Sequence, residues 1–396
     1  MKKFSKRFLM VALIVALVVG FAACGGGGNS GGGDSGGGST SSAPPAPEGA
    51  KDSYTVTACI AGSATPIIIE YGRFAVLTGN VYGNTTTVVD DEFRADMQMT
   101  NVQNAVAGQV DGILIDAFYP EQVKRMADMC AEAKIPFVFY DNDPGADAIN
   151  SIRDNPYFVG CVFLDGVEAG RRIARLALDD GCRNALLIGG QVGQSYFDDR
   201  GGGFTEVFEA EGGKVLSVTR CTDPSEAASK GEDLLSAYGA EADCLYSMAS
   251  DYADQGVYTA MENLGLTGQI GVYCSNTFAT TAEALISGKY LAGDGGDNTM
   301  SQIAYALLQN YMDGHATKDN DGKPPWLTTY SFAVTKDNAA DFLKYCHDDN
   351  IIPVSEYNVK SLTYRFNENV TYQDFVDLIA AWDVESIVAA HQKTWE

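Results

Sequence analysis

The side chains most often used for catalysis or metal binding are few and scattered in this sequence. Its three histidines are His315, His347 and His391, and none belongs to a helical HExxH motif or to a cluster with cysteine. A zinc hydrolase places its ligands on one helix face at that spacing, and a Ser-His-Asp enzyme needs a histidine beside its nucleophile. The histidines therefore argue against both classes of hydrolase.

Two short motifs hint at bound ions or cofactors. Residues 319–322 (DNDG) resemble a calcium loop, but the calcium pattern would begin at Thr317, which is not an acid, and end at Thr328 instead of a glutamate. Residues 189–193 (GGQVG) follow a predicted strand, yet they lack the full G-x-G-x-x-G of a dinucleotide site. We expect a polar turn before Pro324 at the first motif, a tight turn into a helix at the second, and no metal or cofactor.

The chain is acidic, and its composition is that of a globular protein. Its 396 residues include 52 Asp and Glu against 27 Lys and Arg, a formal net charge of −25, and 45% of them are hydrophobic. At roughly 100–200 residues per domain, this length predicts two domains. Nucleic-acid-binding proteins carry a basic stripe that binds phosphate, so the charge argues against a nucleic-acid partner.

The N-terminus predicts export from the cytoplasm. The first seven residues carry four basic side chains, residues 8–23 are nearly all apolar, and Ala22-Ala23 leads into Cys24. This order is typical of a secretory signal peptide over residues 1–23, and an uncleaved anchor helix is the alternative. The sequence Phe-Ala-Ala-Cys resembles a bacterial lipobox, in which the cysteine is lipidated and becomes the first mature residue. In either case we expect an extracytoplasmic protein that is anchored to the cell membrane, in the first case by an N-terminal lipid on Cys24.

Residues 24–52 are predicted to be a tether that starts at the lipidated cysteine. Residues 25–42 are almost entirely glycine, serine and asparagine, and the proline-rich sequence APPAP follows. Such a stretch cannot bury apolar surface and behaves as flexible coil, with an end-to-end distance of roughly 25–30 Å for about 25 residues. The folded body then begins near residue 53.

The remaining eight cysteines form no CxxC pair and are irregularly spaced. Several lie inside apolar, strand-like segments, which favours buried thiols over a disulfide framework, although both stay open. The eight are Cys59, Cys130, Cys161, Cys182, Cys221, Cys244, Cys274 and Cys346.

From about residue 53 the chain alternates strand-like and helix-like segments. Residues 110–115 (VDGILI) are a continuous apolar run, as expected of a strand buried on both faces, and residues 121–134 carry apolar side chains at helical spacing. Repeated units of this kind predict an α/β protein with parallel sheets covered by helices. In such sheets ligands bind beyond the carboxyl ends of the strands. The other predicted strands span residues 54–60, 85–89, 136–140, 184–188, 243–247, 269–274 and 330–334.

The C-terminal segment gives a weaker signal. Residues 337–347 are predicted to be helical, and residues 371–390 show a further amphipathic pattern. Trp382 and Trp395 are candidates to pack this segment on the surface.

The strand ends carry a resemblance to a known family. VDGILID is followed by a helix and by AKIPFVFYD, then by FLD at residues 163–165 with Gly170, and SYFDDRGGGF at residues 195–204 resembles an Arg-Gly-x-Gly-Phe helix start. Residues 247–256 and 271–276 match the next two strand ends. In order and spacing, residues 53–315 resemble the ribose/galactose group of type I periplasmic (solute) binding proteins.

This resemblance implies two similar lobes, each a parallel sheet flanked by helices, joined by a three-crossover hinge. Lobe one would be residues 53–162 plus 298–327, and lobe two residues 163–297 plus 328–396. The lactose-repressor group has the same fold, but it requires an N-terminal DNA-binding helix pair where this chain has a predicted signal peptide and tether. We therefore exclude a repressor.

The family's ligand positions give a candidate site in the cleft between the lobes. Carboxylates there would accept hydrogen bonds from sugar hydroxyls, and aromatic rings such as Tyr71 and Tyr196, with Tyr140, Phe197 and Tyr252 nearby, would cover C–H faces. Helix caps and turns are the alternative role for each acidic or amide residue. The candidate ligand-binding residues are Ser63, Thr65, Asp141 and Asn142 in lobe one, and Asp198, Ser250, Asp251, Ser275, Asn276, Asp297 and Asn298 in lobe two.

Several positions depart from the family's ribose binders. Asn142 and Asp198 stand where those relatives usually have arginine, and Ile67 and Ile68 stand where they often have aromatic rings. The cleft is therefore predicted to be more acidic and less aromatic than a pentose site. We expect a neutral monosaccharide, with a cationic ligand such as an amine, or a metal ion, as open alternatives.

Three functions are compatible with these features. The first is a lipoprotein, monomeric, that binds a small sugar-like solute and delivers it to the membrane permease of an ABC importer. The second is a sensing receptor of the same fold that partners a membrane kinase or chemoreceptor. The third is a glycosidase, which would need two carboxyl groups about 5–10 Å apart, and the sequence identifies no such pair. We therefore expect a binding protein and no enzyme.

Overall fold

The computed structural model describes residues 50–395. The predicted signal peptide, Cys24 and all but the last residues of the predicted tether lie outside the described residues. Within the described part of the chain, no helix is long and apolar enough to cross a membrane.

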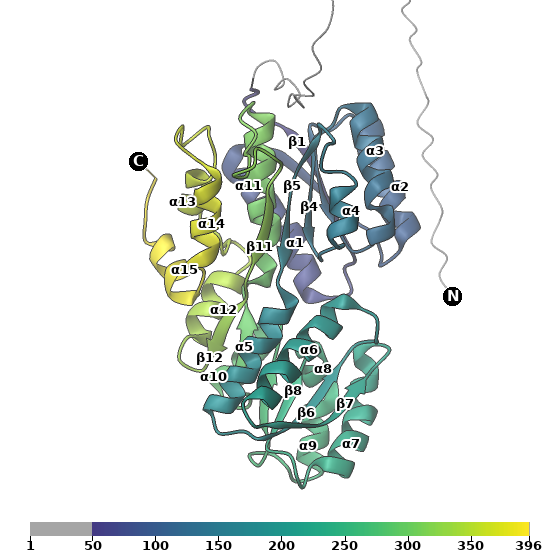
Figure 1. The fold of residues 1–396 in the computed structure, drawn as a ribbon. Helices are drawn as coiled ribbons and strands as arrows, with labels where there is room; N and C mark the ends of the chain where they lie inside the picture. Colours follow the sequence, from purple (N-terminus) through teal and green to yellow (C-terminus); the bar gives the residue numbers. More distant parts are fainter. Residues whose placement is uncertain (1–49, 396) are drawn as a thin grey trace, which may run out of the picture. The chain divides into compact units, whose positions relative to one another are not determined.

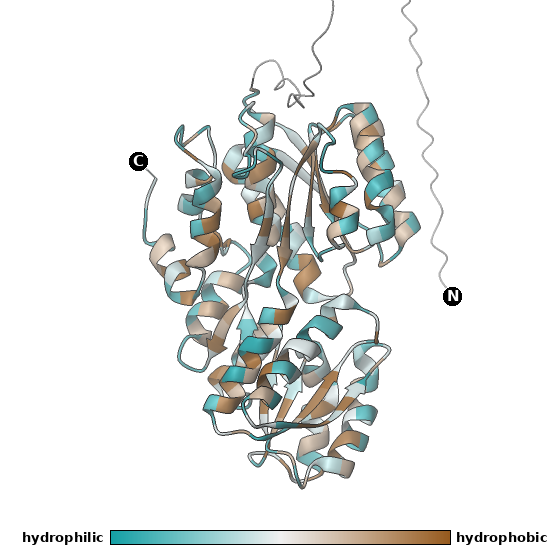
Figure 2. Cartoon of the chain, in the orientation of Figure 1, coloured by the Kyte–Doolittle hydropathy of each residue, from teal (hydrophilic) through white to brown (hydrophobic). Residues whose placement is uncertain are grey.

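The first lobe is built on a six-stranded sheet in which every pairing is parallel (Figure 1). The strand order is β11-β5-β4-β3-β1-β2. All residues of β3 and β4 are buried, which explains their uninterrupted apolar sequences and the brown strands of Figure 2. The strands are β1 (Thr55–Ile60), β2 (Thr85–Asp90), β3 (Gly112–Asp116), β4 (Phe137–Asp141), β5 (Phe158–Leu164) and β11 (Trp326–Thr329).

Helices cover both faces of this sheet. The helices α1 (Pro66–Tyr82) and α11 (Met300–Met312) share one apolar cluster. The other face packs against α2 (Ala95–Ala107), α3 (Val123–Ala133) and the short α4 (Ala146–Asn150).

The second lobe repeats this plan with the order β12-β10-β9-β8-β6-β7, in which only the β10–β12 pairing is antiparallel. Helices α5 and α6 lie on one face, and α7, α9 and α10 lie on the other. The strands are β6 (Asn184–Gly189), β7 (Lys214–Arg220), β8 (Cys244–Ser247), β9 (Gly271–Cys274), β10 (Ala292–Gly295) and β12 (Phe332–Thr335); the helices are α5 (Gly166–Asp179), α6 (Ser195–Ala210), α7 (Ala227–Tyr238), α8 (Ser250–Tyr252), α9 (Tyr258–Asn263), α10 (Ala279–Ile286) and α12 (Ala339–His347).

The predicted α/β fold class is confirmed, and the predicted strands and the helix over residues 121–134 agree with the structure to within two residues at most ends. The two short motifs form turns. Asp319 accepts hydrogen bonds from the backbone N–H groups of Asp321 and Lys323, at 3.0 and 2.8 Å, and residues 190–194 lead into α6. In the described part of the chain all eight cysteines are buried and unpaired.

The chain passes between the lobes at β5–α5, β10–α11 and β11–β12, and its C-terminal helices make two further passages (Figure 1). Helices α13 (Glu356–Ser361) and α14 (Tyr372–Ala380) bury Val359 and Phe375 in the first core, whereas α12 and α15 (Val384–His391) pack into the second. Residues 328–396 were all expected in lobe two, so this core packing differs from that expectation. The amphipathic pattern over residues 371–390 is likewise two helices, because Asp383 caps a new one. The exact lobe boundaries stay a proposal.

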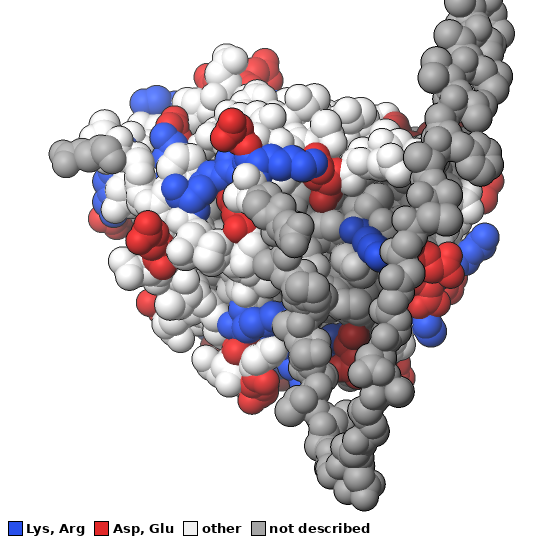
Figure 3. All heavy atoms as spheres, turned by 90° about the horizontal axis from the view of Figure 1, so that it is seen from above, with Lys and Arg blue, Asp and Glu red and all other residues white. Residues whose placement is uncertain are grey.

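Charged side chains of both signs are interspersed on the face seen in Figure 3. Blue Lys and Arg side chains lie beside red Asp and Glu side chains there, with uncharged areas between them. Acidic residues outnumber basic ones in the sequence by 52 to 27. We find no basic stripe on the part of this face that the described residues form.

Candidate functional site: an acidic cavity between the lobes

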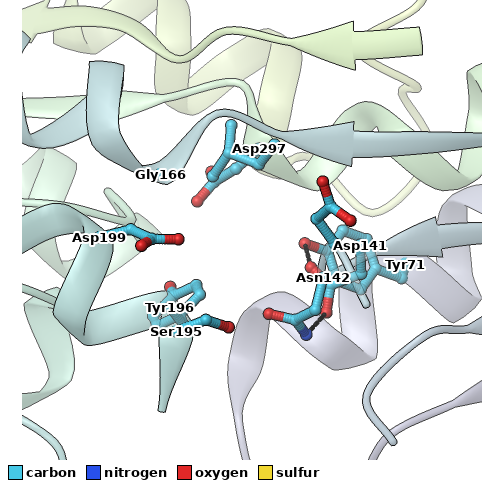
Figure 4. Close-up of a pocket in the computed structure, with 10 residues that line it drawn as sticks. Tyr71, Asp141, Asn142, Gly166, Ser195, Tyr196, Asp199 and Asp297 are labelled. Carbon is cyan, nitrogen blue, oxygen red and sulfur yellow. Dashed lines mark hydrogen bonds between the residues drawn. The ribbon is translucent and has the colours of Figure 1, made fainter. Parts of the chain in front are cut away.

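A cavity lies between the carboxyl ends of the two sheets, lined from both lobes (Figure 4). It is narrow, with about 40 Å³ available to the centres of water-sized spheres, which is space for a few water molecules. A sugar-sized ligand would therefore have to separate the walls slightly. The lining residues are Tyr71, Asp141, Asn142, Asp143, Leu164, Gly166, Ser195, Tyr196, Asp199 and Asp297.

The first lobe contributes Asp141 at the end of β4. The Tyr71 hydroxyl donates to Asp141 Oδ1 at 2.7 Å, and Asn142 Nδ2 donates to Asp141 Oδ2 at 2.7 Å, as Figure 4 shows. The backbone of Asp141 is in the left-handed region, with φ of 79°, which is a strained conformation for a non-glycine residue. The sheet and these two hydrogen bonds hold its carboxyl group at the cavity wall.

Behind this wall lies a second buried acid, Asp116, at the end of β3. Asp116 Oδ2 accepts from the Ala61 N–H at 3.1 Å, and its Oδ1 has no partner among the described residues. Burial raises the pKa of Asp116 well above its usual value, and the charge of Asp141 adds to that rise. Burial also raises the pKa of Asp141 to about 6, although the hydrogen bond from Tyr71 opposes the shift. In the first wall the protonated forms of the two acids are therefore favoured by burial.

The second lobe centres on Arg200, whose side chain is fully buried. It donates to Met248 O at 3.0 Å and to Asn276 Oδ1 at 2.7 Å, and it lies 3.3 Å from Asp297 Oδ2. Its guanidinium carbon also lies 3.9 Å from the centre of the Tyr196 ring, a cation–π contact. The second wall is thus organised around one buried cation.

Asp297 lines the cavity and also lies beside Arg200. It precedes α11 in a short 3-10 turn, and its side chain is almost fully buried. Burial raises the pKa of Asp297 to about 7; the charge of Arg200 opposes that rise and the nearby Asp294 adds to it. At neutral pH the charge of the cavity therefore depends on how many of these carboxyl groups are protonated.

Close packing of α5 on α6 places Arg200. A Cβ on Gly170 would lie 2.0 Å from the backbone oxygen of Arg200, and a Cβ on Gly203 would lie 2.1 Å from the oxygen of Val167. Only glycine fits at both positions. Gly170 of α5 and Gly203 of the Arg-Gly-x-Gly-Phe segment thus allow the two helices to pack closely, and this packing fixes the position of Arg200.

Of the predicted ligand-binding residues, Asp141, Asn142 and Asp297 line the cavity, as do the aromatic candidates Tyr71 and Tyr196. A group behind the second wall supports Arg200 instead. Ser250 donates to Asn276 O, Ser275 donates to Asp294 Oδ2 at 3.0 Å, and Asn276 with φ of 57° accepts from the arginine. The remaining candidates lie elsewhere, outside the lining of this cavity.

Those remaining candidates have other partners. The Ser63 hydroxyl donates to Asp90, Thr65 precedes α1, and Asp198 forms an ion pair with Arg220 at 2.8 Å. Asp251 is largely buried, and burial raises its pKa to about 6. Asn298 donates at 2.9 Å to Glu70 of α1. The role of these candidates in ligand binding stays a prediction.

Sequence reasoning assigned no ligand role to Asp143, Ser195, Asp199 or Arg200. Helical spacing could have found Asp199, because positions 195, 196 and 199 share one face of α6 whereas Asp198 lies on another. Arg200 stood inside the recognised motif and is four residues after Tyr196. No sequence signal distinguished a buried arginine there from an exposed one.

Three comparisons place the chain among known proteins. A family model described as "Periplasmic binding protein domain" matches residues 68–316, so α12 to α15 lie beyond it. No curated protein matches. Many solved structures do.

Similar structures include the periplasmic binding protein component of the arabinose ABC transporter from Shewanella sp. ANA-3, at 20% identity and a TM-score of 0.64, over 73% of this chain and 94% of that one. A solute-binding protein from Actinobacillus succinogenes 130z with bound D-allose is 18% identical, with a TM-score of 0.63 over 73% and 99%. One from Bacillus halodurans C-125 with bound myo-inositol is 17% identical, with a TM-score of 0.61 over 74% and 97%. At these identities the similarity shows a shared fold.

Proposed function

Because this chain belongs to the periplasmic binding protein family, whose members bind solutes outside the cytoplasm, we propose that it binds a small sugar-like molecule in the cavity between its lobes. The observation that carries this proposal is the lining of that cavity. Hydrogen-bonding groups from both lobes meet there at the carboxyl ends of parallel strands, where α/β proteins of this kind bind ligands.

The lining suits a polyhydroxylated ring. Asp141, Asp199 and Asp297 supply carboxylate oxygens, each able to accept hydrogen bonds from hydroxyl groups, and charge-assisted bonds are stronger than neutral ones. Tyr71 and Tyr196 supply aromatic surface for C–H faces. The ligands bound in the similar structures, arabinofuranose, D-allose and myo-inositol, are rings of this type.

Binding would act by closing the lobes. A ligand that contacts Asp141 from one lobe and Asp297 from the other gains both sets of contacts only when the lobes are together. Such a ligand shifts the population toward the closed form, which a membrane partner can recognise. The chain would then deliver its solute, unchanged, to an ABC permease, as a monomer held to the membrane by lipid on Cys24.

The binding test compares two neighbouring acids on α6. Full-length protein is titrated calorimetrically with D-ribose, L-arabinose, D-allose, D-galactose and myo-inositol, with and without calcium. Asp199→Asn changes the lining and should weaken the tightest of these ligands at least tenfold. Asp198→Asn, which faces Arg220 instead, is the matched control and should change affinity less than twofold.

The proposal fails if no member of this panel stabilises or binds the protein. A ligand at about 100 times its dissociation constant should stabilise the folded chain by roughly 2.7 kcal/mol, so thermal unfolding gives an independent readout. Equal losses in the two variants would place the ligand elsewhere. Recovery of a chemically altered sugar after long incubation would argue for catalysis instead of transport.

The anchor and the transport role need cells. Cys24→Ser should release the protein from the membrane fraction, and radiolabelled fatty acid should be incorporated into the parent protein alone. Uptake of the bound sugar should fall when the gene is deleted. Normal uptake together with a lost transcriptional response to that sugar would favour a sensing receptor.

A further inference from the structure

Two cysteines of the second lobe lie close together at the amino ends of the strands, which is the end of the sheet away from the cavity. Cys182 lies in the turn between α5 and β6, and Cys244 is the first residue of β8, which pairs with β6. Their sulfur atoms and a carboxylate oxygen of Asp243 all lie within 4.8 Å of one another. Among residues 50–395 no other three His, Cys, Asp or Glu side chains bring ligand atoms together at this spacing.

The two thiols have different surroundings. Cys182 Sγ lies 3.6 Å from the hydroxyl oxygen of Tyr273, whose proton is donated to Asp180 Oδ2 at 2.7 Å. The neighbouring Cys244 thiol holds the pKa of Cys182 below the usual thiol value, while the Cys182 thiol and burial raise the pKa of Cys244. Cys182 is therefore the better nucleophile of the pair.

Cys182 is also the thiol nearer to solvent. The residue is 7% exposed, and it is flanked by the exposed residues Asp180, Gly181 and Arg183. Cys244 has no exposure. A reagent can thus reach Cys182 through a small movement of this turn, and only Cys182 can then reach Cys244.

Asp243 has a structural role that makes a metal site less suitable. Its Oδ1 accepts from the Asn184 N–H at 2.9 Å and its Oδ2 from the Arg183 N–H at 2.8 Å, which fixes the start of β6. An ion would need this carboxylate, the fully buried Cys244 and a fourth ligand together. Two sulfur atoms within 4.8 Å of each other need no third protein ligand to form a disulfide bond.

We propose that Cys182 and Cys244 are a redox pair that closes to a reversible disulfide in the second lobe. The expected location outside the cytoplasm permits such a bond. The oxidant is a small-molecule or protein disulfide. The Cys182 thiolate attacks one of its sulfur atoms, forms a mixed disulfide and releases the first thiol; Cys244 gives up its proton, attacks Cys182 Sγ and releases the second. One disulfide is reduced to two thiols as two protein thiols are oxidised to one disulfide.

The bond would join the turn before β6 to the first residue of the neighbouring strand β8. It closes the chain between residues 182 and 244, which restricts the unfolded state and stabilises the lobe. The bond lies at the amino ends of the strands, whereas the cavity lies at their carboxyl ends. It therefore changes the stability of the lobe without occupying the ligand cavity.

The test counts thiols in the full-length protein. Reduced protein is equilibrated with oxidised glutathione, quenched with acid, unfolded in guanidinium and titrated with Ellman's reagent. We expect two fewer thiols than in the reduced sample, a tryptic disulfide-linked peptide containing Cys182 and Cys244, and an unfolding temperature several degrees higher that dithiothreitol reverses.

Matched variants locate the bond. Cys182→Ser and Cys244→Ser should each abolish the loss of two thiols, whereas Cys130→Ser, a buried thiol of α3 in the first lobe, should retain it. If a serine variant does not fold, the peptide map of the parent protein decides alone. An unchanged thiol count, a bond between other cysteines, or one zinc ion per chain held by the two thiols would overturn the proposal.

Discussion

Both walls of the cavity bury acidic groups, but the surroundings of these groups differ between the two walls. In the first lobe no Lys or Arg among the described residues forms an ion pair with Asp141 or Asp116, and burial raises the pKa of both acids. In the second lobe Asp297 lies beside the fully buried Arg200, which also receives support from Asn276 and Met248. Only proton uptake neutralises the first wall, whereas in the second wall the fixed charge of Arg200 also opposes the charge of Asp297, whose pKa burial raises to about 7.

This difference predicts different sensitivities. A wall neutralised by protons responds to pH and tolerates an amide in place of an acid. A wall built on a buried cation fails when that cation is removed, because acids and acceptors remain without their partner. Substitutions on the two sides should therefore separate these two behaviours.

The largest effect should come from Arg200→Met. Removing one partner of a buried ion pair leaves uncompensated buried charge, so the free energy of unfolding in urea should fall by about 3–5 kcal/mol. The loss of the arginine charge should also move the titration of Asp297 above its pKa of about 7. Arg171→Met is the control, since its pair with Glu206 is exposed and should cost less than about 1 kcal/mol. Similar losses in the two variants would contradict the role given to Arg200.

The next effect concerns pH and Asp141. The pKa of this acid is about 6 in the folded chain against 3.8 ordinarily, so the folded state binds the proton more tightly. Its contribution to stability is thus complete below pH 4 and is lost as the pH rises to 6, about 3 kcal/mol in all.

Asp141→Asn should remove that part of the pH dependence. Urea unfolding measured from pH 4 to pH 8 should give a flatter profile for the variant than for the parent protein. Asp198→Asn is again the control, because its ion pair with Arg220 lies outside the cavity lining. A variant profile as steep as the parent's would show that Asp141 does not titrate in this window.

Tyr71→Phe should have a smaller effect that depends on pH. The lost hydrogen bond to Asp141 is charge-assisted only when the acid is ionised, so we expect a loss of about 1.5–3 kcal/mol at pH 8 and of about 1 kcal/mol at pH 5. Tyr196→Phe in the second wall loses contacts with Asn276 and Arg200, neither of which titrates, so its loss should vary less between these pH values. The nearby Asp297, whose pKa is about 7, accounts for the variation that remains. Thermal unfolding at the two pH values distinguishes the walls.

The smallest effect should come from the rim of the second wall. The ion pair of Asp198 with Arg220 is partly exposed, so Asp198→Asn should lower the free energy of unfolding by less than about 1 kcal/mol. Raising the salt concentration to 1 M should remove most of that difference. A larger, salt-resistant loss would mean that the rim belongs to the buried network of Arg200.

The sequence was enough to predict most strands of both sheets and the residues at their ends, because most buried parallel strands are continuous apolar runs; β7, β10 and β11 were not predicted. Asp141 and Asn142 follow such a run, and they line the cavity. Contacts that depend on how the helices pack were harder to predict from the sequence. Nothing in the spacing showed that Ser250 and Ser275 would lie behind Arg200 instead of facing a ligand, since that depends on how α6 packs against α5.

The C-terminal segment was predicted least well for a related reason. Amphipathic spacing tells which residues are buried, but both lobes offer an apolar surface, so it cannot tell which lobe receives them. Phe375 and Ile387 lie only twelve positions apart, and they enter different cores.

Those two additional passages bear on how quickly a ligand could be exchanged. Trp382 lies between α14 and α15 and packs against both cores, so a wide separation of the lobes would strip it from one of them. Lobes joined by three segments alone would lack this resistance to opening. Here we expect a smaller opening amplitude, which lowers the entropy lost on closure but slows both capture and escape. A protein with this C-terminal connection between its lobes would hold a bound ligand for longer after each encounter.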